Sequence, residues 1–188
     1  MDFAADCNRC AALCCRAFAF VPGDDFADAK GEGEDCRHLV ERGCSIHAER
    51  AARGYAGCID YECLGAGPAA TLLFPPARAG EAVAVRRARL VAFRILGVVH
   101  AIGAALQRAQ MPAEQAEAIR AMLEPEGGWS YSALLDFDRS DARSRLLGQI
   151  AGAIHNSKKG DFIPLTGLGV VPITRPSLKT AAPQGSKD

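Results

Sequence analysis

Four cysteines crowd into residues 7–15, which read Cys7-Asn8-Arg9-Cys10-Ala11-Ala12-Leu13-Cys14-Cys15. Four more follow, and the chain beyond residue 63 contains none. These later cysteines are Cys36, Cys44, Cys58 and Cys63. Such a density indicates sulfur chemistry, either metal thiolates or disulfides, rather than a packing preference. The stretch therefore predicts an irregular N-terminal region that is held together by its sulfurs.

The expected compartment decides between these kinds of sulfur chemistry. Met1 is followed by Asp2, Phe3 and Asp6, without the basic and apolar run of a secretory signal. We therefore expect a cytoplasmic protein, and the cytosol keeps thiols reduced. Metal binding is favoured over a disulfide framework and over redox-active free thiols.

Charge and hydropathy exclude two classes of partner. Acidic and basic residues balance at 22 each, so no bulk field favours nucleic acid or an anionic membrane. The most apolar stretch, residues 95–106, is shorter than the roughly 20 residues of a membrane-spanning helix. We expect no nucleic-acid and no membrane partner. A protein partner and the oligomeric state are left open.

Eight sulfurs fit two four-ligand sites without remainder, because zinc and iron–sulfur clusters are usually held by four thiolates. The candidate metal ligands are Cys7, Cys10, Cys14, Cys15, Cys36, Cys44, Cys58 and Cys63, with His47 as a weaker candidate. The adjacent Cys14 and Cys15 could serve two different centres, or one could ligate while the other packs. The expected cofactor is zinc, iron or an iron–sulfur cluster, in one or two centres, and sulfur ligands suit either metal.

The spacing disfavours three familiar motifs. A zinc ribbon needs a second Cys-x2-Cys pair, and none follows Cys10. The bacterial ferredoxin run Cys-x2-Cys-x2-Cys-x3-Cys is not matched either. The first three cysteines read Cys-x2-Cys-x3-Cys, the reverse of the motif associated with radical S-adenosylmethionine enzymes.

The rest of the chain predicts a mainly α protein. Residues 1–67 form the cysteine-rich metal-binding region, interrupted by an acidic loop at 23–35. Residues 81–158 form a helical region, in which periodicity and breakers predict about three helices at 81–109, 112–124 and 139–157. Residues 68–80 read as a linker. The tail, residues 159–188, is rich in Pro and Gly and is expected to be mostly without regular structure.

The first predicted helix has a basic side and an apolar side. At about 100° per residue, its polar residues share one arc of about 160°. They are Arg86, Arg87, Arg89, Arg94, His100, Gln107 and Arg108. We expect a solvated basic face over a buried apolar face.

The cysteine pattern resembles the YkgJ-like cysteine-cluster family, described as zinc- or iron-chelating. It is more closely similar to the cysteine-rich N-terminal domain of some bacterial pentapeptide-repeat proteins. The motifs are Cys10-Ala11-Ala12-Leu13-Cys14-Cys15, Cys36-Arg37-His38-Leu39, Cys44-Ser45-Ile46-His47, Gly57-Cys58 and Cys63-Leu64-Gly65-Ala66-Gly67. The resemblance extends to about residue 157. No five-residue repeat follows, so functions of the repeats are not implied.

Three functions are weighed. The first is a metal-binding protein whose centre is structural or regulatory; whether it is also an enzyme is left open, and a non-enzymatic role is favoured. The second is an iron–sulfur protein-modifying enzyme, because the family is also similar to flagellin lysine methylases. No catalytic residue is assigned to this enzyme, although Asp60, Tyr61 and Glu62 could line its site. The third is a zinc-thiolate redox sensor. The first is the hypothesis carried forward.

Overall fold

A computed structural model describes residues 1–41, 43–76, 81–109 and 111–156. The described part is mainly helical, as predicted. Its elements are the 3-10 turn η1 (Cys7–Arg9), α1 (Cys14–Ala17), β1 (Leu39–Val40), β2 (Gly43–Cys44), the 3-10 turn η2 (His47–Glu49), α2 (Gly57–Asp60), α3 (Ala66–Leu73), α4 (Val83–Arg108), α5 (Ala113–Leu123), α6 (Tyr131–Arg139) and α7 (Ala142–Asn156). The tail predicted at 159–188 lies outside the described residues.

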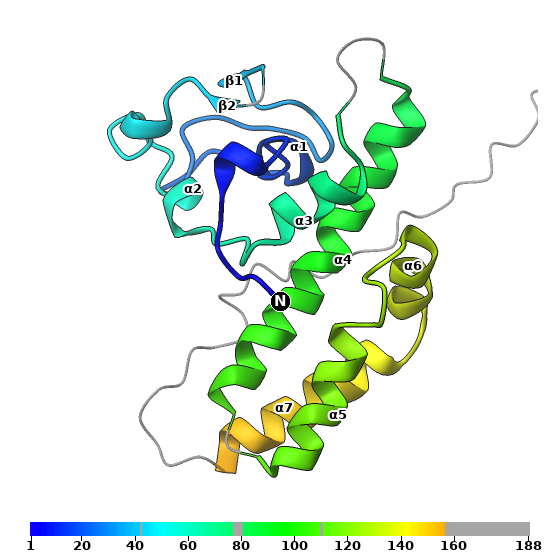
Figure 1. Cartoon of the computed structure of the whole chain (residues 1–188). Helices are drawn as coiled ribbons and strands as arrows, with labels where there is room; N and C mark the ends of the chain where they lie inside the picture. Colours follow the sequence, from blue (N-terminus) through cyan, green and yellow to red (C-terminus); the bar gives the residue numbers. More distant parts are fainter. Residues whose placement is uncertain (42, 77–80, 110, 157–188) are drawn as a thin grey trace, which may run out of the picture.

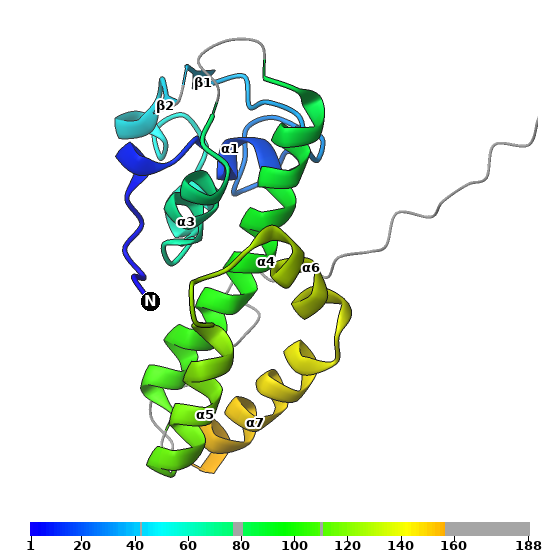
Figure 2. The same cartoon turned by 45° about the vertical axis from the view of Figure 1, so that its right-hand side comes forward.

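The long helix α4 is the axis of the molecule (Figures 1 and 2). The cysteine-rich region and α3 lie along its first half, and α5, α6 and α7 pack along the remainder. The only sheet in the described residues is the short antiparallel hairpin β1–β2, with Leu39 opposite Cys44. The cysteine-rich region is therefore built mainly from loops and single turns.

One hydrophobic core joins both parts of the molecule, and α4 supplies most of it. Phe93 of α4 is 1% exposed and faces the ring of Phe18 at 5.8 Å between centroids. The largest fully buried side chains are Phe93, Leu13, Ile102, Leu123, Leu134, Leu146, Ile150 and Val99. They come from the segment before α1 and from α4, α5, α6 and α7, so the helices close over one shared interior.

The helices differ from the sequence prediction at two places. Residues 66–73, expected as the end of the cysteine region and a linker, form α3, which packs on α4. A further helix, α6, begins after Ser130, whose hydroxyl oxygen accepts a hydrogen bond from the amide of Ala133 at 3.1 Å. Among the residues that the structure describes, five helices therefore follow residue 65, rather than about three.

The prediction that the basic face of α4 is solvated is wrong at Arg89 and His100. Arg89 and His100 are 4% and 5% exposed. The Arg89 guanidinium donates to the carbonyl oxygen of Phe74 and pairs with the carboxylate of Glu81. Amphipathic spacing shows which residues share a side of a helix. It does not show that another segment with matching acceptors covers that side.

The first half of this basic side binds the acidic loop instead of solvent. Arg86 pairs with Asp35, and Arg94 pairs with Glu32. Arg94 also donates to the carbonyl oxygen of Ala17 at 2.6 Å. Exposed ion pairs contribute little stability individually. Together these contacts fix the position of the loop on α4.

One described helix, α4, is long and apolar enough to cross a membrane, with a mean hydropathy of 1.7 over its best 18-residue window. That window is 67% buried inside the protein. Packing against α3, α5, α6 and α7 explains the apolar character as that of a core helix. The 12-residue stretch seen in the sequence is thus part of a longer helix.

His100 links α4 to the cysteine-rich region and makes stability depend on pH. Its Nδ1 donates to the carbonyl oxygen of Leu64 at 2.5 Å, and its ring meets that of Phe3 edge-on. Burial lowers the pKa of His100, although the Leu64 carbonyl opposes this shift. The fold therefore favours the neutral ring. The stabilisation that the buried neutral ring of His100 contributes is complete above about pH 6.5, where the ring is also neutral in the unfolded chain. This stabilisation falls as the pH drops below that value.

We expect His100→Gln to weaken this pH dependence, because glutamine retains a donor but does not titrate. The variant should lose about 1 kcal/mol at pH 8 and lose less additional stability than the wild type toward pH 5. Urea unfolding of both proteins at several pH values provides the comparison, since carboxylates titrate equally in both. Parallel stability curves for the two proteins would contradict the role assigned to His100.

Candidate metal centre

The structure places the eight cysteines on several short elements. Cys7 lies in η1 and Cys10 ends it, with its amide donating to the carbonyl oxygen of Cys7 at 3.3 Å. Ala12 has a positive φ of 54°, and Cys14 and Cys15 then begin α1. The other positions are Cys36 before β1, Cys44 in β2, Cys58 in α2 and Cys63 shortly before α3. All eight are free thiols.

Four cysteines form a first neighbourhood, at the start of α3. Cys7 interacts electrostatically with Cys14 and Cys63, and Cys10 interacts with Cys14. The sulfurs of Cys10 and Cys63 both approach Gly67 of α3. A Cβ at Gly67 would lie 2.7 Å from the Cys10 sulfur and 3.7 Å from the Cys63 sulfur. We call Cys7, Cys10, Cys14 and Cys63 the first set.

The remaining four cysteines form a second neighbourhood, around the hairpin. Cys15 interacts electrostatically with Cys36 and Cys44, and Cys58 interacts with the same two residues. Two hydrogen bonds hold this arrangement: the Cys36 amide donates to the carbonyl oxygen of Cys15 at 2.9 Å, and the Leu39 amide donates to that of Cys36 at 2.9 Å. We call Cys15, Cys36, Cys44 and Cys58 the second set.

The two sets meet at Cys14 and Cys15. The side chains of these neighbours share a hydrogen bond, and Cys14 also interacts with Cys58 of the second set. Arg50 lies at the same boundary, with electrostatic interactions to Cys7, Cys14 and Cys58. Its guanidinium is held by the carbonyl oxygens of His47 and Cys58, at 2.8 and 3.0 Å. A fixed cation therefore stands between the sets.

The thiols are neighbours without forming a finished coordination shell. Among the described residues, no three Cys, His, Asp or Glu side chains converge closely enough to hold an ion. The donor chemistry nevertheless fits a metal, since all eight cysteines are free thiols and Gly67 leaves room for the sulfurs of two of them. Completing a shell requires side-chain rotations and loss of thiol protons.

Burial and neighbouring groups set the proton affinity of these thiols. Burial raises the pKa of Cys10, and it raises that of Cys58 to about 11. The hydrogen bond shared with Cys15 lowers the pKa of Cys14 to about 7 and raises that of Cys15. Metal loading of the buried thiols should therefore release protons and become more favourable as the pH rises.

The two histidines near the sulfurs have different surroundings. His47, the weaker ligand candidate, is exposed at the start of η2. His38 lies 3.0 Å from the hydroxyl oxygen of Tyr55, and that hydroxyl donates to the carboxylate of Asp28. His38 thus belongs to a hydrogen-bonded chain that holds the loop of residues 20–30. The ligand role of His47 stays a prediction.

The segment considered for an enzyme site packs partly into the interior. The ring of Tyr61 meets that of Phe18 edge-on at 4.9 Å, and burial raises the pKa of Tyr61. Glu62 accepts a hydrogen bond from the Leu64 amide at 2.8 Å, whereas Asp60 is exposed. Tyr61 and Glu62 therefore make packing and hydrogen-bond contacts that are typical of structural residues.

Sequence reasoning missed two basic residues and one glycine. Arg50 lies between the sets, and Lys30 lies near Cys36 and Cys15. Lys30 is 8% exposed, and its ammonium donates to the carbonyl oxygens of Gly31 and Glu34 at 3.0 and 2.9 Å. No sequence signal distinguishes these cations from other basic residues. In the sequence, the glycine, Gly67, marks only the end of the cysteine-rich region and part of a family motif.

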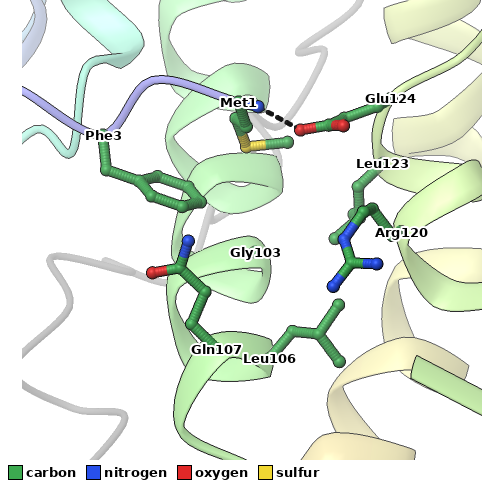
Figure 3. Close-up of a pocket in the computed structure, with 8 residues that line it drawn as sticks. All are labelled: Met1, Phe3, Gly103, Leu106, Gln107, Arg120, Leu123 and Glu124. Carbon is green, nitrogen blue, oxygen red and sulfur yellow. Dashed lines mark hydrogen bonds and ion pairs between the residues drawn. The ribbon is translucent and has the colours of Figure 1, made fainter. Parts of the chain in front are cut away.

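A small pocket lies apart from the cysteines (Figure 3). The N-terminal residues Met1 and Phe3 close it against α4 and α5, and the Met1 amino group pairs with Glu124. Phe3 and Met1 approach the bare backbone of Gly103, where a Cβ would lie 3.0 Å from the Phe3 ring. The pocket therefore marks where the N-terminal segment docks on α4.

Gly67→Ala is expected to damage metal binding while sparing the helical part of the fold. The added methyl group would displace the Cys10 sulfur, which lies 2.7 Å from its position. The helix itself should gain about 0.5–1 kcal/mol, because glycine is unfavourable within a helix. Metal affinity, measured by competition with a coloured chelator, should fall at least about tenfold, equivalent to about 1.4 kcal/mol.

Gly97→Ala in α4 is the matched control, because nothing lies within 4 Å of the added Cβ there. It makes the same helix-favouring change without a sulfur neighbour. Equal metal affinities for the Gly67 and Gly97 variants would show that the approach of Cys10 to Gly67 does not matter for binding.

Comparisons with known proteins give one short similarity. A 67-residue stretch is 45% identical to the uncharacterized protein YybG of Bacillus subtilis (strain 168). The match covers 35% of this chain and 24% of YybG. No protein-family model matches the chain, and no solved structure matches it. The chain is thus partly homologous to YybG, while membership of the YkgJ-like family stays a prediction.

Proposed function

We propose that this chain is a metal-binding cysteine-cluster protein, related to the YkgJ-like family, whose thiolate centre has a structural or regulatory role. The metal is zinc or iron, alone or in an iron–sulfur cluster. The centre would hold residues 1–67 together and fix them against α4. The expected cytoplasmic location belongs to the same proposal, because it keeps the thiols reduced.

The supporting observation is that four of the eight free cysteines lie in a segment with almost no core of its own. Between residues 18 and 64, residue 42 aside, the buried side chains are those of Lys30, Ile46 and Tyr55. Ordering the backbone costs about 1–2 kcal/mol per residue. Two buried apolar side chains offset little of that cost, whereas metal–thiolate bonds contribute folding free energy directly.

Cys10→Ser tests the proposal. Cys10 is half-buried against α3, so its loss should lower the metal bound per chain and increase amide hydrogen exchange across residues 1–67. Asn8→Ser, an exposed change in the same turn that keeps all eight sulfurs, is the control. The proposal fails if Cys10→Ser retains the metal content and exchange pattern of the Asn8 variant.

A zinc-thiolate redox sensor is the second candidate, and the pair Cys14–Cys15 favours it. Cys14 is exposed, and its hydrogen bond with Cys15 lowers its pKa to about 7, which favours the reactive thiolate. Mild peroxide should then oxidise thiols reversibly and release metal. Unchanged thiol and metal content after peroxide treatment would eliminate this candidate and leave the structural role.

A further inference from the structure

We propose that the cysteines form two separate four-sulfur metal centres, divided between the adjacent residues Cys14 and Cys15. The first centre uses Cys7, Cys10, Cys14 and Cys63, and the second uses Cys15, Cys36, Cys44 and Cys58. Each would hold its own thiolate-preferring metal. This division rests on the proposed function and adds to it the ligand set of each centre.

Different parts of the backbone deliver the two sets. The first set comes from η1 and its C-cap, from the first residue of α1, and from Cys63, which lies shortly before α3. Gly65 allows the chain to turn into α3, because its φ is 79° and a Cβ there would lie 2.3 Å from the carbonyl oxygen of Asp2. Cys63 and Cys10 are thereby brought to the same side of Gly67, where a Cβ would lie, although they are far apart in sequence.

The second set is assembled by the hairpin and its neighbours. Antiparallel pairing places Cys44 opposite Leu39, and the Leu39 amide bonds to the carbonyl oxygen of Cys36. The Cys36 amide in turn bonds to the backbone of Cys15. This chain of backbone contacts brings Cys15, Cys36 and Cys44 together without using η1 or α3.

The division falls at Cys14 and Cys15, because side chains of consecutive helical residues leave the helix about 100° apart. The two thiols share a hydrogen bond, yet they have different further neighbours. Cys14 interacts with Cys7 and Cys10, whereas Cys15 interacts with the hairpin cysteines. Cys58 interacts most with Cys14 of the first set, and then with Cys36 and Cys44 of the second set. Assigning Cys58 to the second set gives four sulfurs to each centre.

The charges at the boundary are consistent with two anionic centres. A divalent ion with four thiolates carries a net charge of about −2. Two such centres on adjacent residues repel each other unless cations lie near them. Arg50 interacts with cysteines of both sets, and the buried Lys30 interacts with Cys36 and Cys15 of the second set.

The test is a cobalt(II) titration of the full chain without oxygen, followed through the ligand-field and sulfur-to-cobalt absorption bands. The wild type should bind two ions per chain. Cys63→Ser and Cys44→Ser should each bind one fewer. The double variant of the same set, Cys7→Ser with Cys63→Ser, should keep one ion, whereas Cys63→Ser with Cys44→Ser should keep none.

The two double variants are matched, since each removes two sulfurs. Circular dichroism reports whether α4–α7 persist, and the wild-type stoichiometry does not depend on any variant folding. No cobalt uptake by the wild type would overturn the proposed function itself. Uptake of a single ion by the wild type, or equal loss in the two double variants, would overturn the division while leaving metal binding intact.

Discussion

Removing the metal from loaded protein is expected to unfold most of residues 18–64 while α5–α7 remain helical. This segment buries two apolar side chains, Ile46 and Tyr55, among its described residues. Structural zinc in small peptides contributes apparent free energies of about 10–16 kcal/mol, which is folding free energy. Amide hydrogen exchange after chelation should therefore approach that of an unfolded chain in residues 18–64.

The helical part supplies the internal comparison. Leu134 and Leu146 are 0% and 1% exposed in the shared core, so amides of α6 and α7 should stay protected after chelation. Chelator saturated with zinc beforehand controls for effects of the reagent. Unchanged protection of residues 18–64 after complete metal removal would contradict a structural role for the centre.

Phe93→Ala is expected to cost about 3–5 kcal/mol of stability, the usual range for deleting a buried aromatic ring. Phe93 is 1% exposed in α4 and lies against Phe18, whose ring in turn packs on Tyr61. The cavity would open where the cysteine-rich region meets the helical core. Urea unfolding of metal-loaded protein, followed by circular dichroism, measures the loss.

Val91→Ala is the control for Phe93→Ala. Val91 is on the same helix but 37% exposed, so its truncation should cost about 1 kcal/mol or less. The Phe93 variant should also loosen the cysteine-rich region, because Phe18 loses its partner. A cost below about 1 kcal/mol for Phe93→Ala would show that this contact does not join the two parts.

Apolar periodicity predicted α4, and Pro112 with the breakers after residue 124 predicted α5. No sequence signal predicted α3, because residues 65–68 indicate the end of the cysteine-rich region and the start of a linker. Gly65 in fact supplies the left-handed turn that starts α3, and Gly67 makes room for sulfur. These roles depend on what the chain packs against, which local sequence does not reveal.

Local sequence also failed to predict what covers the basic side of α4. Its basic residues were expected in solvent, yet Arg89 is buried with Glu81, and Arg94 binds Ala17 and Glu32. Helical periodicity groups residues by side without identifying what covers each side. The acidic loop was visible in the sequence, but its pairing with this helix is a tertiary contact.

The candidate site was predictable in composition but not in arrangement. Cysteine density identified all eight candidate ligands, and the adjacent Cys14 and Cys15 suggested two possible centres. Spacing could not group the others, since Cys63 lies beside Cys10 while Cys36 lies near Cys15. That grouping is produced by the hairpin and by the docking of α3.

Metal analysis of protein purified without oxygen, combined with its absorption spectrum and a thiol titration, tests the central claim most directly. The account predicts thiolate-bound zinc or iron in two centres, with all eight cysteines protected from a thiol reagent until the metal is removed. A brown, charge-transfer spectrum would identify iron–sulfur clusters as the form of that metal. Metal-free protein with eight reactive thiols and a fully ordered cysteine-rich region would contradict the claim.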